Sequence, residues 1–200
     1  TDFLRGSGLT MTERGAIVVN AKSETGIPGV YSAGDCATVR HLVTGADVYM
    51  PLGTTSNKQG RVAGLQAAGV SGEVFAGVVG SQMVRVFDLE VARTGIDEAE
   101  ATKYGIPLES ASAKWHDIAG YCPDSRPIFM KLFIDSRNRK LVGAQTAGEN
   151  GAALRVNVAA TAITAGMTID EFAYLDLGYA PPFSPVWDVL LVAAQKLVKR

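Results

Sequence analysis

The sequence is poor in the residues that define several large protein classes. Its 200 residues include only two cysteines and two histidines, and 20 acidic residues nearly cancel 19 basic ones. A net charge of −1 argues against nucleic acid or an anionic membrane as a partner, because both attract a basic surplus. Two cysteines too distant for a CxxC motif build no disulfide scaffold, so a reducing, cytoplasmic setting fits best. His41 and His116 lack ligand-like neighbours, so we expect no metal site.

Long apolar runs and recognised N-terminal signals are also lacking. No run approaches the roughly 18 residues of a spanning helix, and no charged-then-apolar signal peptide opens the chain. The glycines of Gly6-Ser-Gly8 do not complete a GxGxxG motif. Because the chain starts without Met, in a segment that reads like the middle of an element, we expect a fragment. The composition, 47% hydrophobic and 20% charged, is nevertheless that of a chain with a buried core.

A break in composition divides the chain. Three glycines interrupt every regular pattern between residues 70 and 80, so we predict one domain over 1–70 and another over 80–200. In the first, β-branched and apolar runs predict buried strands over 15–20 and 29–33. A helical pattern follows over 54–68, with Thr54 or Thr55 as its cap.

The second domain reads as strands joined by hairpins, with helices outside them. The segment 135–140 is a strong turn signal, and Thr168 with Glu171 resembles a capping box. This pattern predicts an α+β domain. The expected strands are 83–87, 89–94, 111–118, 128–134 and 141–146; the expected helices are 97–104, 150–165, a short one after Thr168, and 184–198 with Pro185 first.

The sharpest motif is the segment 25–35, Thr-Gly-Ile-Pro-Gly-Val-Tyr-Ser-Ala-Gly-Asp. A glycine lets the backbone approach a ligand, and a carboxylate after a strand suits a sugar hydroxyl. Gly34-Asp35 alone would be an ordinary turn. The whole string, however, resembles the second flavin-binding signature of the pyridine nucleotide–disulfide oxidoreductases. The resemblance implies that Asp35, next to Gly34, binds the ribityl chain of FAD.

The segment 49–61, Tyr-Met-Pro-Leu-Gly-Thr-Thr-Ser-Asn-Lys-Gln-Gly-Arg, resembles the next characteristic element of the same family. The resemblance implies a helix whose start, Leu52, Gly53 and Thr54, faces the pyrimidine edge of the flavin. Free N–H groups and the helix dipole stabilise negative charge there. A plain amphipathic helix is the alternative. Asn57 is a weaker candidate for the mouth of a substrate site.

The segment 177–188, Leu-Gly-Tyr-Ala-Pro-Pro-Phe-Ser-Pro-Val-Trp-Asp, distinguishes branches of the family. Larger disulfide reductases carry an acid/base histidine here, and neither His41 nor His116 lies in this segment. The segment instead resembles the single-cysteine group, which contains coenzyme A-disulfide reductase, NADH oxidase and NADH peroxidase. In that group the redox cysteine lies far upstream, so Cys36 and Cys122 read as small buried side chains.

Two tyrosines are the catalytic candidates. The resemblance to coenzyme A-disulfide reductase implies that Tyr121 and Tyr179 lie near the redox cysteine of the partner subunit. A phenol can hydrogen-bond or protonate a leaving thiolate. The alternative is that both phenols simply pack at a subunit interface, where tyrosine is common. Trp187 is a weaker candidate for substrate binding.

Taken together, these features predict an α/β fragment of an FAD-binding Rossmann-like domain followed by an α+β dimerisation domain with a mainly antiparallel sheet. The parent would be a homodimeric, FAD-dependent NAD(P)H oxidoreductase whose NAD(P)H site lies outside this chain. Coenzyme A disulfide is the expected acceptor, and oxygen or peroxide is the alternative. A different alternative is an isolated dimerisation module without activity, and we expect the isolated chain to be inactive and to hold no stoichiometric FAD.

Overall fold

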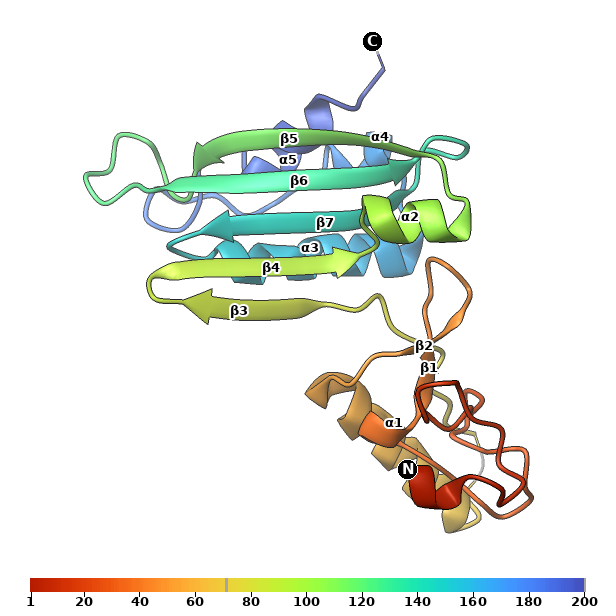
Figure 1. Ribbon diagram of the computed structural model, residues 1–200. Coiled ribbons are helices and arrows are strands. Elements are labelled where there is room, and N and C mark those ends of the chain that lie inside the picture. The colour runs from red at the N-terminus through yellow and green to blue at the C-terminus, as the bar shows by residue number, and fades with distance from the viewer. Residues whose placement is uncertain (71, 200) are drawn as a thin grey trace. The chain divides into compact units, whose positions relative to one another are not determined.

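A computed structural model describes residues 1–70 and 72–199. They divide into two compact units, residues 1–78 and residues 79–200 (Figure 1). The first unit is built on one long helix, and the second on one large sheet.

The first unit combines its long helix with a small sheet and irregular segments. The short strands pair antiparallel, with Thr38 opposite Tyr49, and a small core gathers Ile17, Val19 and Ala37. Its elements are the 3-10 turns η1 (Asp2–Leu4) and η2 (Gly34–Cys36), strands β1 (Thr38–Arg40) and β2 (Asp47–Tyr49), and helix α1 (Gly53–Ala67).

Two predicted strands of this unit are wrong. Within 15–20 and 29–33, only Ile17 and Tyr31 form β-bridges, and these bridges are isolated. A strand needs an extended neighbour over several residues, and these segments meet theirs at single positions. The predicted helix over 54–68 is confirmed to within a residue, but its predicted cap is wrong. Leu52 is the N-cap, and no side chain caps the helix.

The second unit is a five-stranded, wholly antiparallel sheet, which confirms the predicted mainly antiparallel architecture. Its strand order is β3-β4-β7-β6-β5, so the last strand along the chain lies at the centre (Figure 1). The strands are β3 (Gln82–Val86), β4 (Leu89–Gly95), β5 (Leu108–His116), β6 (Pro127–Asp135) and β7 (Leu141–Gly148).

Helices cover one face of this sheet. Helix α3 packs on β4 and β7, and α5 packs on β5 and β6 (Figure 1). Phe133, Phe172 and Leu190 are fully buried in this layer. The helices of the unit are α2 (Glu98–Tyr104), α3 (Ala152–Ala165), α4 (Ile169–Phe172) and α5 (Val189–Gln195).

Side-chain capping explains where α2, α4 and α5 begin. The predicted capping box at Thr168 is confirmed, and Asp97 forms a second one at the start of α2. The predicted start of the last helix at Ser184 and Pro185 is wrong. Asp188 accepts a hydrogen bond from the N–H of Leu190 and is the N-cap, so α5 starts at Val189, five residues later than Ser184.

Candidate functional site

The Gly34–Asp35 turn is locked onto the first turns of α1. Asp35 is exposed in η2, and its Oδ1 accepts a hydrogen bond of 2.8 Å from Ser56 Oγ. Gly34 has φ +77°, and a Cβ there would lie 3.3 Å from the side chain of Ser56. A side chain at position 34 would therefore be strained and crowded. The turn holds the carboxylate in a fixed place and leaves it open to solvent.

The buried side-chain amide of Gln59, on α1, also holds this turn in place. Gln59 accepts a hydrogen bond from the N–H of Gly34 (3.0 Å) and donates one to the carbonyl of Thr38 (2.8 Å). It therefore ties η2 and β1 to α1 through one side chain. Sequence reasoning missed Gln59 and Ser56. A signal existed, since Thr55, Gln59 and Val62 have the spacing of one buried helix face.

The start of α1 leaves its backbone donors available. Its first intrahelical bond runs from the N–H of Ser56 to Leu52, so the N–H groups of Gly53, Thr54 and Thr55 precede the helical ladder. Gly53 and Thr54 are exposed, whereas Thr55 Oγ1 is buried without a partner. An uncapped helix start attracts negative charge. Together with the exposed carboxylate of Asp35, this edge fits a cofactor that has both hydroxyls and an electron-rich ring, as FAD has.

The second unit brings the two candidate tyrosines together. Tyr121 lies in the loop 117–126, here called the Tyr121 loop, and Tyr179 lies in the segment 174–188, called the Tyr179 segment. The phenol of Tyr179 is the main cause that raises the pKa of Tyr121, and desolvation adds to it. Both rings are accessible, with 74% of Tyr121 and 47% of Tyr179 exposed.

One backbone hydrogen bond joins the two loops, and another closes a turn within the Tyr121 loop. The N–H of Ala119 donates to the carbonyl of Pro181 at 3.1 Å, and the N–H of Cys122 donates to Ala119 at 2.9 Å. Ala119 and Cys122 lie within two residues of Tyr121, and Pro181 lies two residues after Tyr179, so these bonds fix the backbone next to both tyrosines.

A buried ion pair lies at the base of these loops. Arg155 of α3 donates from Nε to Asp188 Oδ2 at 2.7 Å, and their side chains are 11% and 8% exposed. Arg155 Nη2 donates to the carbonyl of Asp117 at 2.6 Å. Sequence reasoning missed this pair. Its signal was a single cation among the small and apolar residues of a helix, where charge is retained only if it is paired.

The remaining candidates lie apart from these contacts. Asn57 is exposed on α1 in the first unit, and Trp187 is 48% exposed in the second. Their substrate roles stay predictions. Cys36 and Cys122 are free and partly buried, and their thiols lie near the carbonyls of Ala33 and Pro181.

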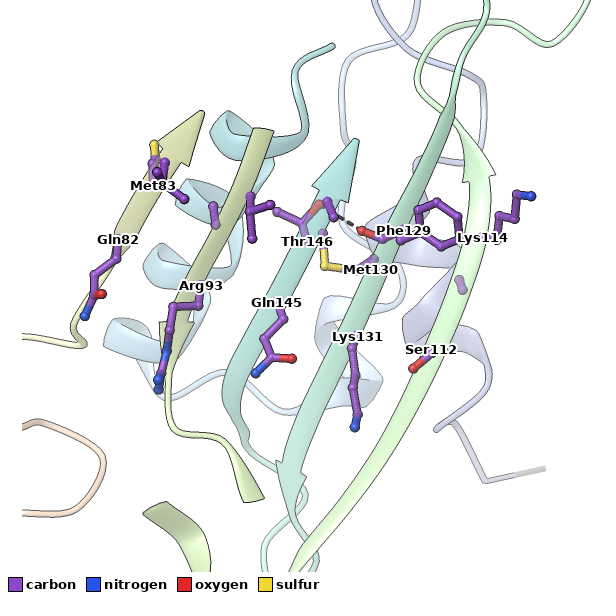
Figure 2. A pocket seen from close by; sticks show the side chains of 15 residues that line it. Gln82, Met83, Arg93, Ser112, Lys114, Phe129, Met130, Lys131, Gln145 and Thr146 are labelled. Carbon is purple, nitrogen blue, oxygen red and sulfur yellow. Dashed lines mark hydrogen bonds between the residues drawn. The ribbon is translucent and has the colours of Figure 1, made fainter. Parts of the chain in front are cut away.

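A groove of about 700 Å³ runs over the sheet of the second unit (Figure 2). Two of the basic side chains that line it already form ion pairs, Arg93 with Asp97 and Lys131 with Glu98. None of the predicted site residues lines it. Over residues 1–70 and 72–199, no group of three or more side chains suits a metal ion, and no helix has the length and apolarity to cross a membrane.

Known families match both units. The description "Pyridine nucleotide-disulphide oxidoreductase" matches residues 1–67, and "Pyridine nucleotide-disulphide oxidoreductase, dimerisation domain" matches residues 81–189.

Three curated relatives illustrate the range of similarity. The chain is 41% identical to the NAD(P)H sulfur oxidoreductase (CoA-dependent) of Pyrococcus furiosus, over 95% of this chain and 42% of that protein. It is 36% identical to an NADH oxidase of Methanocaldococcus jannaschii, over 92% of this chain and 41% of that protein. It is 29% identical to the coenzyme A disulfide reductase of Staphylococcus haemolyticus (97% and 44%). The chain thus spans less than half the length of each.

Solved structures have the same arrangement of elements. A NAD-dependent persulfide reductase from A. fulgidus superposes with a TM-score of 0.93 at 38% identity, over 98% of this chain and 36% of that one. The reduced CoADR-RHD of Bacillus anthracis gives 0.89 at 34% identity, over 96% and 35%.

Proposed function

Because the chain belongs to the pyridine nucleotide-disulphide oxidoreductase family, we propose that it is the C-terminal part of a flavin-dependent NAD(P)H:disulfide oxidoreductase. Residues 1–70 supply part of an FAD-binding domain, and residues 80–200 supply the dimerisation domain. The NAD(P)H site belongs to a part of the enzyme outside this chain. The relatives' greater length supports this division.

The observation that carries the proposal is the Gly34–Asp35 turn fixed against the uncapped start of α1. Asp35 would accept hydrogen bonds from the ribityl hydroxyls of FAD, and Gly34 would let the backbone lie close to that chain. The N–H groups that follow Leu52, at Gly53 and Thr54, would stabilise negative charge on the flavin ring. A bound flavin would supply two-electron transfer between the nicotinamide and a disulfide.

Coenzyme A disulfide is the acceptor we propose. The relatives named for coenzyme A disulfide and for CoA-dependent sulfur reduction support this choice. The balanced reaction consumes NAD(P)H, one proton and one disulfide, and it gives NAD(P)⁺ and two thiols. The two electrons cleave the S–S bond, and each sulfur leaves as a thiol.

Tyr179 protonates the leaving thiolate in this proposal. Tyr179 carries one phenolic O–H donor, and its side chain is 47% exposed, so a ligand can reach it. Transfer of this proton would leave a phenolate, to which solvent restores the proton.

The active form we propose is a homodimer. A match to a dimerisation domain supports it, as do three exposed aromatic side chains, Tyr174, Phe183 and Trp187, within or beside the Tyr179 segment. Aromatic residues are enriched at subunit interfaces. Simple interface packing of both tyrosines is the alternative role. A cytoplasmic setting stays a prediction from the two free cysteines.

The second candidate function is NADH oxidation by oxygen or peroxide. The 36% identity to an NADH oxidase favours it. In that case the upstream cysteine would cycle through a sulfenate. A third candidate, an isolated dimerisation module without activity, predicts a colourless purified protein without flavin fluorescence.

The acceptor is tested by comparing coenzyme A disulfide, oxygen and peroxide in the full-length enzyme that contains this chain. We expect NAD(P)H consumption to be fastest with coenzyme A disulfide and to release two thiols per NAD(P)H. Turnover with oxygen or peroxide, but none with the disulfide, would select the second candidate.

A further inference from the structure

We propose that Gln59 is a positioning residue for FAD, because its side-chain amide holds both ends of the turn that carries Asp35. This role rests on the proposed FAD site and adds to it a side chain that does not contact the ligand. Gln59 lies on the buried face of α1 and is only 3% exposed, whereas Asp35 is exposed.

One primary amide binds the backbone on both sides of Asp35. Gln59 Oε1 accepts a hydrogen bond from the N–H of Gly34, the residue before Asp35, at 3.0 Å. Gln59 Nε2 donates to the carbonyl of Thr38, three residues after Asp35, at 2.8 Å. The orientation of the amide is unambiguous, since a backbone N–H needs an acceptor and a carbonyl needs a donor. The two bonds therefore fix where the ends of the turn lie relative to each other.

Gln59 is itself fixed on its helix. The hydroxyl of Ser23, a residue that is 1% exposed, donates to the backbone carbonyl of Gln59 at 3.3 Å. Thr55 and Val62 share the buried face of α1 with Gln59. The amide therefore ties the turn to a helix face that packs inside the first unit.

The turn and the helix start must stay aligned, because a flavin would use both. The ribityl hydroxyls would need Asp35, and the ring would need the N–H groups of Gly53 and Thr54. Ser56 Oγ donates to Asp35 Oδ1 at 2.8 Å, which fixes the carboxylate but not the backbone that carries it. Hydrogen bonds weaken steeply as their geometry departs from the ideal, so a shift of the turn along α1 weakens FAD binding even when both parts are intact.

The test measures the dissociation constant of FAD in the full-length enzyme that contains this chain, by flavin fluorescence during titration of the apoenzyme. Gln59→Met retains an unbranched side chain of similar length and removes both hydrogen bonds to the turn. We expect the dissociation constant to rise roughly 5- to 20-fold, since each neutral hydrogen bond contributes about 2- to 10-fold. Gln59→Glu keeps an acceptor for Gly34, so its rise should be smaller, roughly 2- to 5-fold.

Val62→Ala is the matched control. Val62 is 4% exposed on the same face of α1, and its side chain has no polar atom to bind the turn. We expect Val62→Ala to lower the melting temperature while the dissociation constant of FAD stays within about twofold of the parent's. A merely structural role for Gln59 predicts the same result for Gln59→Met.

Hydrogen exchange of the Gly34 amide gives a second readout that needs no cofactor. It is followed by NMR in this 200-residue chain. Gln59→Met should speed the exchange of Gly34 roughly 10-fold, because the amide loses its acceptor. Gln59→Glu and Val62→Ala should leave this exchange close to that of the parent chain.

Three outcomes overturn the proposed role of Gln59. They are an unchanged FAD dissociation constant in folded Gln59→Met, an equal rise in Val62→Ala, and unchanged exchange of Gly34 in Gln59→Met. If Gln59→Met does not fold, Gln59→Glu takes its place, and FAD affinity equal to the parent's then overturns the role.

Asp35→Ala, measured beside these variants, separates this role from the proposed function. If Asp35→Ala weakens FAD binding and Gln59→Met does not, only the role of Gln59 is wrong. If neither substitution weakens FAD binding, the proposed FAD site itself is wrong.

Discussion

Replacing Tyr179 by phenylalanine is expected to lower kcat for coenzyme A disulfide by about 100-fold or more in the full-length enzyme. The substitution removes the proton that we assign to the leaving thiolate, and general acids contribute roughly 10²- to 10⁴-fold to rate. Flavin content should not change, because Tyr179 lies outside the unit that holds Asp35. Steady-state consumption of NAD(P)H and release of thiol measure the effect.

Tyr174→Phe is the control for this substitution, since Tyr174 is an exposed tyrosine of the same segment. It should retain full turnover. If Tyr179→Phe stays within twofold of the parent enzyme, its role as an acid is wrong, and packing at the subunit interface becomes the better reading. Tyr121→Phe should have a smaller effect than Tyr179→Phe, because it removes the partner and not the acid.

Replacing Gly143 by alanine should destabilise the second unit by about 3 kcal/mol or more. Gly143 of β7 lies opposite Gly95 of β4, and a Cβ at 143 would overlap the carbonyl oxygen of Ile96 and press on the ring of Phe133. Overpacking a core costs roughly 1–3 kcal/mol, and a clash with backbone cannot be relieved by a rotamer change. Two strands would have to separate locally.

Denaturant unfolding followed by tryptophan fluorescence measures this loss. Both tryptophans, Trp115 and Trp187, belong to the second unit, so the signal reports on that unit alone. Gly178→Ala is the control, because a Cβ there meets nothing within 4 Å. Equal unfolding midpoints for Gly143→Ala and Gly178→Ala would contradict the close approach of β4 and β7 at Gly143.

The second unit was predictable because its signals are local. The turn at 135–140 lies between strands of nearly the predicted length, and the capping box at Thr168 starts its helix as expected. Helix α2 begins one residue after its predicted start, because Asp97 is its cap. Each signal acts within a few residues, so the sequence alone carries it. The predicted start of the last helix was wrong because two local signals compete there. Pro185 is a good helix start, and Asp188, three residues later, is a better one.

The first unit was less predictable because its contacts are distant. The apolar run at 15–20 has the composition of a strand, but pairing depends on what lies beside it, and Ile17 meets only single partners. The site residues that were missed share this cause. Gln59 hydrogen-bonds to Gly34, and Arg155 hydrogen-bonds to Asp117 and Asp188. In each case the partner is more than 20 residues away in the sequence.

The flavin affinity of Asp35→Ala in the full-length enzyme tests the FAD assignment most directly, with Asp47→Ala, an exposed carboxylate of β2, as the control. A hydrogen bond to a charged group contributes about 1.5–3 kcal/mol, so we expect the dissociation constant of FAD to rise roughly 10- to 100-fold in Asp35→Ala only. An Asp35→Ala enzyme that binds FAD as tightly as the parent would contradict the assignment of the Gly34–Asp35 turn to the ribityl chain.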